Sequence, residues 1–297
     1  MTQGRVGIIG IEYQLPKFVL KQEEVSEALE IDINKLKIGL GLEEFSVPDL
    51  NEDCVSLAMS AVSKLLKKMN INKEDVGKIE VGSESNFDFS KSIKSYLLDL
   101  FPTNTSISGC DNVHACYGGT NALLNSLAWL ESSICTKKYA IVVCTDVCFY
   151  RENSAIPTSG AGAVAMLLGR DPVLALISDV LFHYSSNESD FLKPVSKYPF
   201  SVLKGKESVE NYMKAFSHFF GSGCVSSLLC FEKIREGCEV INFEQSLSKR
   251  IEISFSQYIK IINNAGVAST QSICEEENDN ERYKIVKIEG DVRYYGQ

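Results

Sequence analysis

Two kinds of apolar pattern alternate along the first part of this chain. Short, nearly continuous apolar runs, such as VGIIGI at 6–11 and YAIVVCTDVCFY at 139–150, are typical of strands covered on both faces. Between them, 54–69 spaces its apolar residues as an amphipathic helix does. Further strands are expected at 78–81 and 162–168, further helices at 91–100 and 116–132, and a strand, a turn and another strand at 282–297. This alternation predicts a layered α/β domain with helices packed on a mostly buried sheet.

A weak internal similarity points to two related halves. Residues 161–168 (AGAVAMLL) and 222–229 (SGCVSSLL) share Gly, Val, Leu and Leu at matching places, although short matches of this kind also arise by chance. The first copy follows the opening strand at 6–11 after about 155 residues, whereas the second follows a candidate strand at 173–180 after only about 50. We therefore expect two units, 1–172 and a shortened 173–297.

Composition and charge narrow the class of protein. The chain has 297 residues, of which 44% are hydrophobic and 23% charged, as in ordinary globular proteins. Its formal net charge of −9 argues against nucleic acid as the main partner. No apolar run approaches the roughly 20 residues that span a bilayer, and the start lacks the pattern of a signal peptide. We expect a cytoplasmic protein with no membrane span.

The ten cysteines are predicted to be reduced thiols, because most stand inside apolar runs rather than at paired loop positions. Cys144 and Cys148 are separated by three residues with no histidine nearby, and the chain has no CxxC pair. We therefore expect no metal site.

The segment VHACYGGTN at 113–121 is the strongest candidate for chemistry. Cys116 follows an expected strand end, precedes two glycines and opens a helix. At a helix start, the dipole and unpaired backbone N–H groups lower the pKa of a thiol, and the same amides can hold a thioester oxyanion. Cys116 is thus a candidate nucleophile that takes up an acyl group. A buried cysteine whose glycines only allow tight packing fits the same residues.

A second candidate is Glu84 in VGSESNFD, just after an expected strand end. A carboxylate there acts as a general base if desolvation raises its pKa. An exposed loop glutamate without a role fits the local sequence equally.

The order of several longer segments resembles 3-hydroxy-3-methylglutaryl-CoA synthases. These segments are KIEVGSES, KSIKSYLLDLF, ACYGGTNALLNSLAWLESS, YAIVV, PTSGAGAVAMLLG, DFLKP and YPF. The likeness runs from residue 6 to about residue 216, resumes at FGSGCVSSLL and continues to YKIVKIEGDVRYY. It implies a thiolase-like fold with two related halves in five αβαβα layers, the first half complete and the second shortened.

The resemblance also implies roles for particular residues. Cys116 would take acetyl from acetyl-CoA, and Glu84 would remove a proton from its methyl group, so that the carbanion attacks the ketone of acetoacetyl-CoA. Ser222 matches a serine whose backbone N–H polarises the thioester carbonyl. The resemblance further implies a homodimer that works in the mevalonate route to isoprenoids and sterols, without a metal or redox cofactor. The residues that hold CoA are not assigned.

The chain also departs from the family pattern. The family's histidine segment, which orients the acetoacetyl group, is missing between 216 and 221, together with a later asparagine. None of the three histidines, His114, His183 and His218, stands in a matching stretch, although His114 is near enough in sequence to contact the thiolate. Two interpretations follow: a synthase impaired by this loss, or a non-catalytic relative that binds CoA thioesters or pairs with a full-length synthase subunit. A decarboxylating polyketide-type enzyme is disfavoured, because Glu84 stands where the synthase needs its base.

Overall fold

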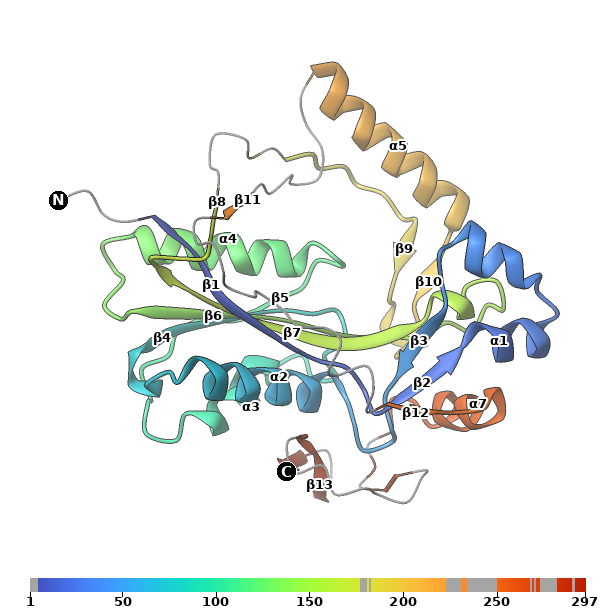
Figure 1. Cartoon of the computed structure of the whole chain (residues 1–297), viewed down its shortest axis with the longest axis horizontal. Helices are drawn as coiled ribbons and strands as arrows, with labels where there is room; N and C mark the ends of the chain where they lie inside the picture. Colours follow the sequence, from blue (N-terminus) through green and yellow to red (C-terminus); the bar gives the residue numbers. More distant parts are fainter. Residues whose placement is uncertain are drawn as a thin grey trace.

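A seven-stranded sheet forms the centre of the part of the chain that the computed structural model describes (Figure 1). The described residues are 5–176, 181, 183–222, 231–233, 250–267, 269, 271–272, 282–289 and 292–297. The strand order is β11-β8-β1-β7-β6-β4-β5. Their bounds are β1 (Val6–Gln14), β4 (Val76–Gly82), β5 (Asp111–Asn112), β6 (Tyr139–Cys148), β7 (Gly160–Arg170), β8 (Leu174–Leu176) and β11 (Phe231–Lys233). Strands β5, β4 and β6 run parallel, and the other neighbours pair antiparallel.

Helices cover both faces of this sheet, as the apolar runs predict. Figure 1 shows α4 (Gly118–Glu131) on one side, and α2 (Cys54–Met69) with the short α3 (Ile93–Leu97) on the other. Along β6, Ile141 and Val143 pack into the cluster under α2, whereas Ala140 and Val142 pack into the cluster under α4. A strand that is buried on both faces must be apolar at consecutive positions, which explains the run at 139–143.

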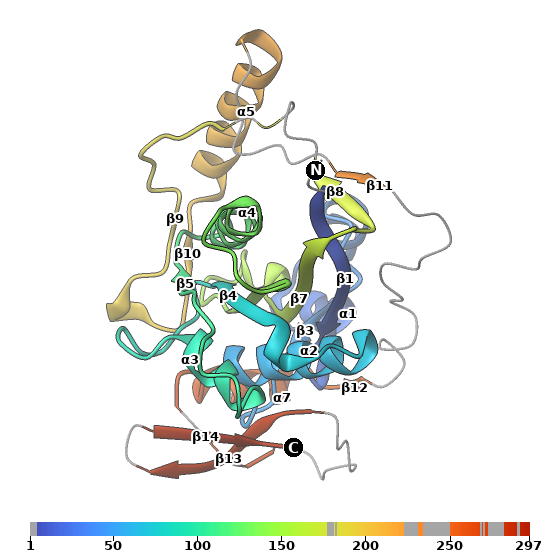
Figure 2. The same cartoon turned by 90° about the vertical axis from the view of Figure 1, so that its left-hand side faces the viewer.

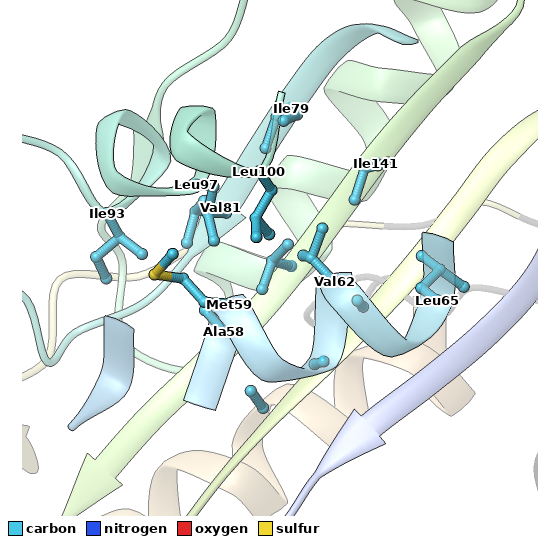
Figure 3. Packing of buried hydrophobic residues seen from close by; sticks show 14 of the residues in the cluster. Ala58, Met59, Val62, Leu65, Ile79, Val81, Ile93, Leu97, Leu100 and Ile141 are labelled. Atoms are coloured by element: carbon cyan, nitrogen blue, oxygen red, sulfur yellow. The ribbon is translucent and has the colours of Figure 1, made fainter. Parts of the chain in front are cut away.

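Helix α2 has clear sequence signals at both ends. Asp53 caps its N-terminus by accepting a hydrogen bond from the Ser56 N–H, and the Ser56 hydroxyl accepts one from the Asp53 N–H in return. Asn70 ends the helix in a left-handed conformation. Met59 of this helix lies beside Ile93 and Leu97 of α3 (Figure 3), and both helices belong to one buried cluster with residues of β4.

Smaller elements surround the central sheet. A three-stranded sheet contains β12, β2 and β3, and α1 and α7 pack beside it. Helix α5 projects from the body in both views (Figure 2). The bounds are β2 (Phe18–Lys21), β3 (Glu44–Val47), β9 (Phe191–Leu192), β10 (Val202–Leu203), β12 (Ile251–Glu252), β13 (Lys284–Glu289), β14 (Val292–Gly296), α1 (Gln22–Leu29), α5 (Gly205–Ser222) and α7 (Phe255–Asn263).

The expected elements of the first part of the chain are confirmed, with shifted ends. The helix expected at 116–132 begins only at Gly118, and the strand expected from 173 is β8, beyond which 177–180 lie outside the described residues. The second copy of the repeat also lies outside them, except that Ser222 is the last residue of α5. The two tail strands are confirmed, and the turn between them is not described.

Neither α5 nor α7 was expected from the sequence. Strand β8, from the start of the expected second unit, pairs with β1 of the first. The division at residues 172 and 173 stays a prediction. No helix among the described residues is sufficiently long and apolar to span a membrane.

Candidate active site

Cys116 lies on a tight turn between β5 and α4. Ala115 adopts a left-handed conformation with φ of 40°, which costs a non-glycine residue about 1–2 kcal/mol. The N–H groups of Tyr117 and Gly118 donate to the His114 carbonyl at 2.9 and 3.2 Å. The turn leaves Cys116 partly exposed, two residues before Gly118, the first residue of the helix.

The backbone amides of this helix start are less available than the sequence predicts. Those of Tyr117 and Gly118 are occupied by the His114 carbonyl. The N–H of Cys116 itself interacts with its own thiol, which favours the thiolate. The expectation that amides of this turn hold a thioester oxyanion stays a prediction.

The prediction of a lowered thiol pKa is wrong. Partial burial raises the pKa of Cys116, and the negative charges of Glu84 and Asp146 raise it further. Cys148 acts in the same direction, and only the hydrogen bond from the Cys116 N–H opposes them. Desolvation and nearby carboxylates therefore oppose ionisation of the Cys116 thiol.

The two glycines after Cys116 allow the helix to approach the sheet closely. A Cβ atom on Gly118 would lie 2.5 Å from the Asn112 carbonyl oxygen, and one on Gly119 would lie 2.6 Å from the Cys144 sulfur. A Cβ on Gly82, at the end of β4, would lie 2.3 Å from the Gly119 nitrogen. These glycines therefore serve tight packing, which sets the position of the turn that carries Cys116.

A hydrogen-bonded asparagine beneath the turn joins the helix to the sheet. The Asn112 amide donates to the Glu80 carboxylate at 2.7 Å, and its oxygen accepts from Asn121 at 2.7 Å and from Asn125 at 3.2 Å. Glu80 is only 2% exposed and forms an ion pair with Lys78. Because β5 and α4 share this buried asparagine, the turn between them has little freedom to shift.

Glu84 lies on the loop that follows β4, and Asp146 of β6 fastens that loop. One Asp146 carboxylate oxygen accepts from the Glu84 N–H at 2.9 Å, from the Ser85 hydroxyl at 2.9 Å and from the Ser83 hydroxyl at 3.3 Å. The loop is thus held to the end of the neighbouring parallel strand, with the half-buried Glu84 side chain beside it.

The surroundings of Glu84 suit a general base. Burial raises its pKa from the ordinary carboxyl value, and the charge of Asp146 raises it further, while Lys193 lowers it. Glu84 and Cys116 lie within electrostatic reach, since the charge of Glu84 raises the pKa of the thiol. The structure therefore brings the two candidate residues together at one end of the sheet.

A pocket of about 530 Å³ opens beside Glu84. Its wall contains Asp111 and Lys193 together with apolar side chains, of which Phe89, Val113 and Val195 are 92%, 72% and 69% exposed. Such a mixture of apolar surface and a few charged groups is typical of a small-molecule site.

Asp146 and Lys193 are functional candidates that the sequence analysis missed. Asp146 is the one charged residue of β6, a strand otherwise apolar enough to be buried, and a carboxylate in such a run is a signal of a special environment. Lys193 stands in DFLKP, a segment used for the resemblance but not for a role.

The other predicted residues remain less defined. Ser222 ends α5, and its side chain lies outside the described residues, so its role stays a prediction. The His114 ring packs edge-on against Tyr117, at 5.3 Å between ring centres, and its suggested contact with the thiol also stays a prediction. The six cysteines described, which include Cys116, are free thiols. Among the described residues, no cluster of His, Cys, Asp or Glu is arranged to hold a metal.

Comparison with known proteins identifies the family. A family model described as Hydroxymethylglutaryl-coenzyme A synthase N terminal matches residues 3–173. A Hydroxymethylglutaryl coenzyme A synthase of Fusarium sp. is 42% identical over 212 residues, which cover 71% of this chain and 46% of that protein. The Saccharomyces cerevisiae Hydroxymethylglutaryl-CoA synthase is 41% identical over 219 residues, which cover 73% of this chain and 44% of that protein. The chain thus spans about half the length of the curated relatives it matches.

A solved structure also shares the fold. MvaS in complex with 3-hydroxy-3-methylglutaryl coenzyme A superposes with a TM-score of 0.89 at 20% sequence identity, covering 100% of both chains. This likeness confirms the expected thiolase-like α/β fold. Because the family model extends over more than half of its residues, this chain belongs to the hydroxymethylglutaryl-coenzyme A synthase family.

Proposed function

We propose that this chain is an acyltransferase that condenses acetyl-CoA with acetoacetyl-CoA through an acetyl thioester on Cys116, with Glu84 as the base. The observation that carries the proposal is that Cys116 and Glu84, from separate loops at one end of the sheet, lie within electrostatic reach of each other, with Glu84 in the wall of a pocket of about 530 Å³. The family membership supports the same chemistry.

The proposed reaction has three steps. The Cys116 sulfur attacks the acetyl carbonyl, and its proton leaves with the CoA thiol. The Glu84 carboxylate then takes a proton from the acetyl methyl group. The resulting carbanion adds to the ketone carbon of acetoacetyl-CoA, and the former ketone oxygen takes up a proton. Water finally cleaves the thioester and restores the thiol. The proposal requires no metal or redox cofactor.

The proposal extends to assembly and location. We propose a homodimer, and the sheet supports it because β5 is its edge strand and Val113, directly after β5, is 72% exposed. We also propose a cytoplasmic location within the mevalonate route, which is consistent with the free thiols among the described cysteines.

Incubation with acetyl-CoA followed by peptide mass analysis tests the first step. We expect acetyl on Cys116 in the parent protein and no acetylated peptide there in Cys116→Ser. Cys110→Ser is the matched control, because Cys110 is also an exposed free thiol, and it should leave the labelling of Cys116 intact. An unmodified Cys116 in the parent protein contradicts the proposal.

A second candidate function is a non-catalytic partner of a full-length synthase subunit. The supporting observation is α4, which has no charged residue over 118–130 although its Asn125 and Ala128 are exposed. A helix without charges is typical of burial on all sides, so this face suits cover by another chain.

Two measurements separate these functions. The second function predicts acetylation of Cys116 without product from acetyl-CoA plus acetoacetyl-CoA, and co-elution with a full-length synthase subunit on size-exclusion chromatography. Product from the pure protein that disappears in Cys116→Ser contradicts it.

A further inference from the structure

Lys193 reaches the candidate active site from a distant part of the chain. It follows β9 directly and is half-buried between two cavities, of which one also contains Glu84 in its wall. Its ammonium group donates to the Ser85 hydroxyl at 3.0 Å and to the Val147 carbonyl at 2.9 Å. Lys193 therefore bridges the loop after β4 and the end of β6.

The Ser85 hydroxyl connects this ammonium group to Glu84. It accepts from Lys193 and from the Val147 N–H at 2.9 Å, and donates to Asp146 at 2.9 Å. Asp146 in turn accepts from the Glu84 N–H. Ser85 is 5% exposed, so water does not readily replace these partners.

Lys193 also supplies positive charge where carboxylates gather. The described residues that line the 530 Å³ pocket include three acids, Glu84, Asp88 and Asp111, and one base, Lys193. Three further titratable groups act electrostatically with Glu84, namely Asp146 from β6, Cys116 from the turn before α4, and Tyr150 beyond β6. Among these groups Lys193 alone offsets negative charge.

We propose that Lys193 is a positioning residue for Glu84, holding the loop after β4 against β6 through Ser85 and Val147 and countering the charge of Asp146. The inference rests on the proposed function, in which Glu84 is the base. Without the ammonium group, the pKa of Glu84 rises, because Lys193 lowers it and burial and Asp146 raise it. Ionisation of Glu84 then requires a higher pH, and the loop loses its tie to β6.

The test separates the two half-reactions. Acetylation of Cys116 is measured by mass analysis, and proton removal is measured as deuterium uptake into the bound acetyl methyl group in D2O across a pH series. In Lys193→Met we expect acetylation to persist and deuterium uptake at pH 7 to fall by about 10- to 100-fold, with its pH profile moved to higher pH. Lys193→Arg retains the charge and should restore the position of the profile.

A matched control and an activity-independent measurement complete the test. Lys197→Met removes an exposed lysine from the same segment and should change neither quantity. The Glu84 carboxyl is titrated by carbon-13 NMR in glutamate-labelled protein, with its signal assigned by Glu84→Gln, and should titrate at higher pH in Lys193→Met.

The outcomes distinguish the inference from the proposed function. If the Glu84 titration and the uptake profile are the same in Lys193→Met as in the parent, the inference is wrong. If acetylation and deuterium uptake fall together while the pH profile of uptake and the Glu84 titration do not shift, Lys193 is only structural and the inference is again wrong. If the parent takes up no deuterium but its Glu84 titration moves in Lys193→Met, the proposed base function fails while the electrostatic role of Lys193 stands.

Discussion

At the scale of single residues, the surroundings of Cys116 oppose ionisation of its thiol. The start of a helix such as α4 is expected to lower the pKa of a nearby thiol. Partial burial and the carboxylates of Glu84 and Asp146 instead raise the pKa of Cys116. A thiol in this state is less exposed to chance oxidation, which proceeds through the thiolate. Cys144, on β6, is still less reactive, because burial raises its pKa to about 11.

The coupling between Glu84 and Cys116 makes acetylation depend on pH in a way that can be tested. The acetylation rate should increase as pH rises towards the raised pKa of Cys116. Replacing Glu84 by Gln removes a charge that raises this pKa, so the thiolate forms at lower pH and the acetylation profile moves to lower pH. Initial rates of Cys116 acetylation over a pH series measure the shift.

Glu131→Gln is the control for this prediction. Glu131 is an exposed glutamate at the far end of α4, so its replacement should leave the profile in place. An acetylation profile that stays fixed in Glu84→Gln, or moves to higher pH, would show that the two residues are not coupled.

At the scale of elements, close contact between α4 and the sheet positions Cys116. Gly82 of β4 and Gly118 and Gly119 of α4 leave no room for a Cβ atom, and Asn112 links β5 to the same helix. The close contact between α4 and the sheet thus fixes the position of the turn that carries Cys116. Sites carried on such junctions hold reacting groups more accurately than free loops do.

Gly119→Ala tests this junction. Its Cβ would lie 2.6 Å from the Cys144 sulfur, so we expect a loss of about 1–3 kcal/mol in the free energy of unfolding, measured by urea denaturation. Cys144→Ala removes that sulfur, and the double variant should recover part of the loss. Gly160→Ala is the control, because its Cβ would meet no atom within 4 Å. Equal stability of Gly119→Ala and the parent would show that the junction has spare room.

At the scale of the whole molecule, the C-terminal hairpin joins the beginning of α2. Arg293 and the Tyr295 hydroxyl both donate to the Asp53 carboxylate, at 2.8 and 2.7 Å, and the Arg293 guanidinium also lies over the Phe87 ring. The Tyr283 N–H donates to the Ser60 hydroxyl of α2 at 2.8 Å. Figure 2 shows β13 and β14 beneath α2 and α3. The final strands therefore contribute to the same body as the candidate site.

Arg293→Met measures how much this docking contributes. The side chain is 11% exposed and its loss leaves Asp53 without its cation, so the free energy of unfolding should fall by about 1.5–3 kcal/mol. Lys287→Met removes an exposed cation from the same hairpin and should change stability by less than about 0.5 kcal/mol. If chemical denaturation gives the same value for both variants, the hairpin does not depend on Asp53.

Much of the fold follows from the sequence because periodicity is a local property. The run at 139–150 and the helical spacing at 54–69 predict β6 and α2, since neighbouring residues alone determine which faces are apolar. The family segments likewise point to Cys116 and Glu84 without any knowledge of their distance in space. Helix α5 was not expected, although its apolar residues have amphipathic spacing. It lies beyond the part of the sequence in which strand and helix patterns alternate clearly.

What the sequence determined by itself is therefore the alternation of strands and helices, the family, and the identity of the two candidate catalytic residues. Only the tertiary structure decided the direction in which the pKa of Cys116 shifts, the packing role of its glycines and the place of Lys193. These properties depend on groups that folding brings together from remote segments, such as Glu84, Asp146 and Lys193. Burial and charge act through space, so their combined effect on the pKa of one thiol cannot be read from the order of residues along the chain.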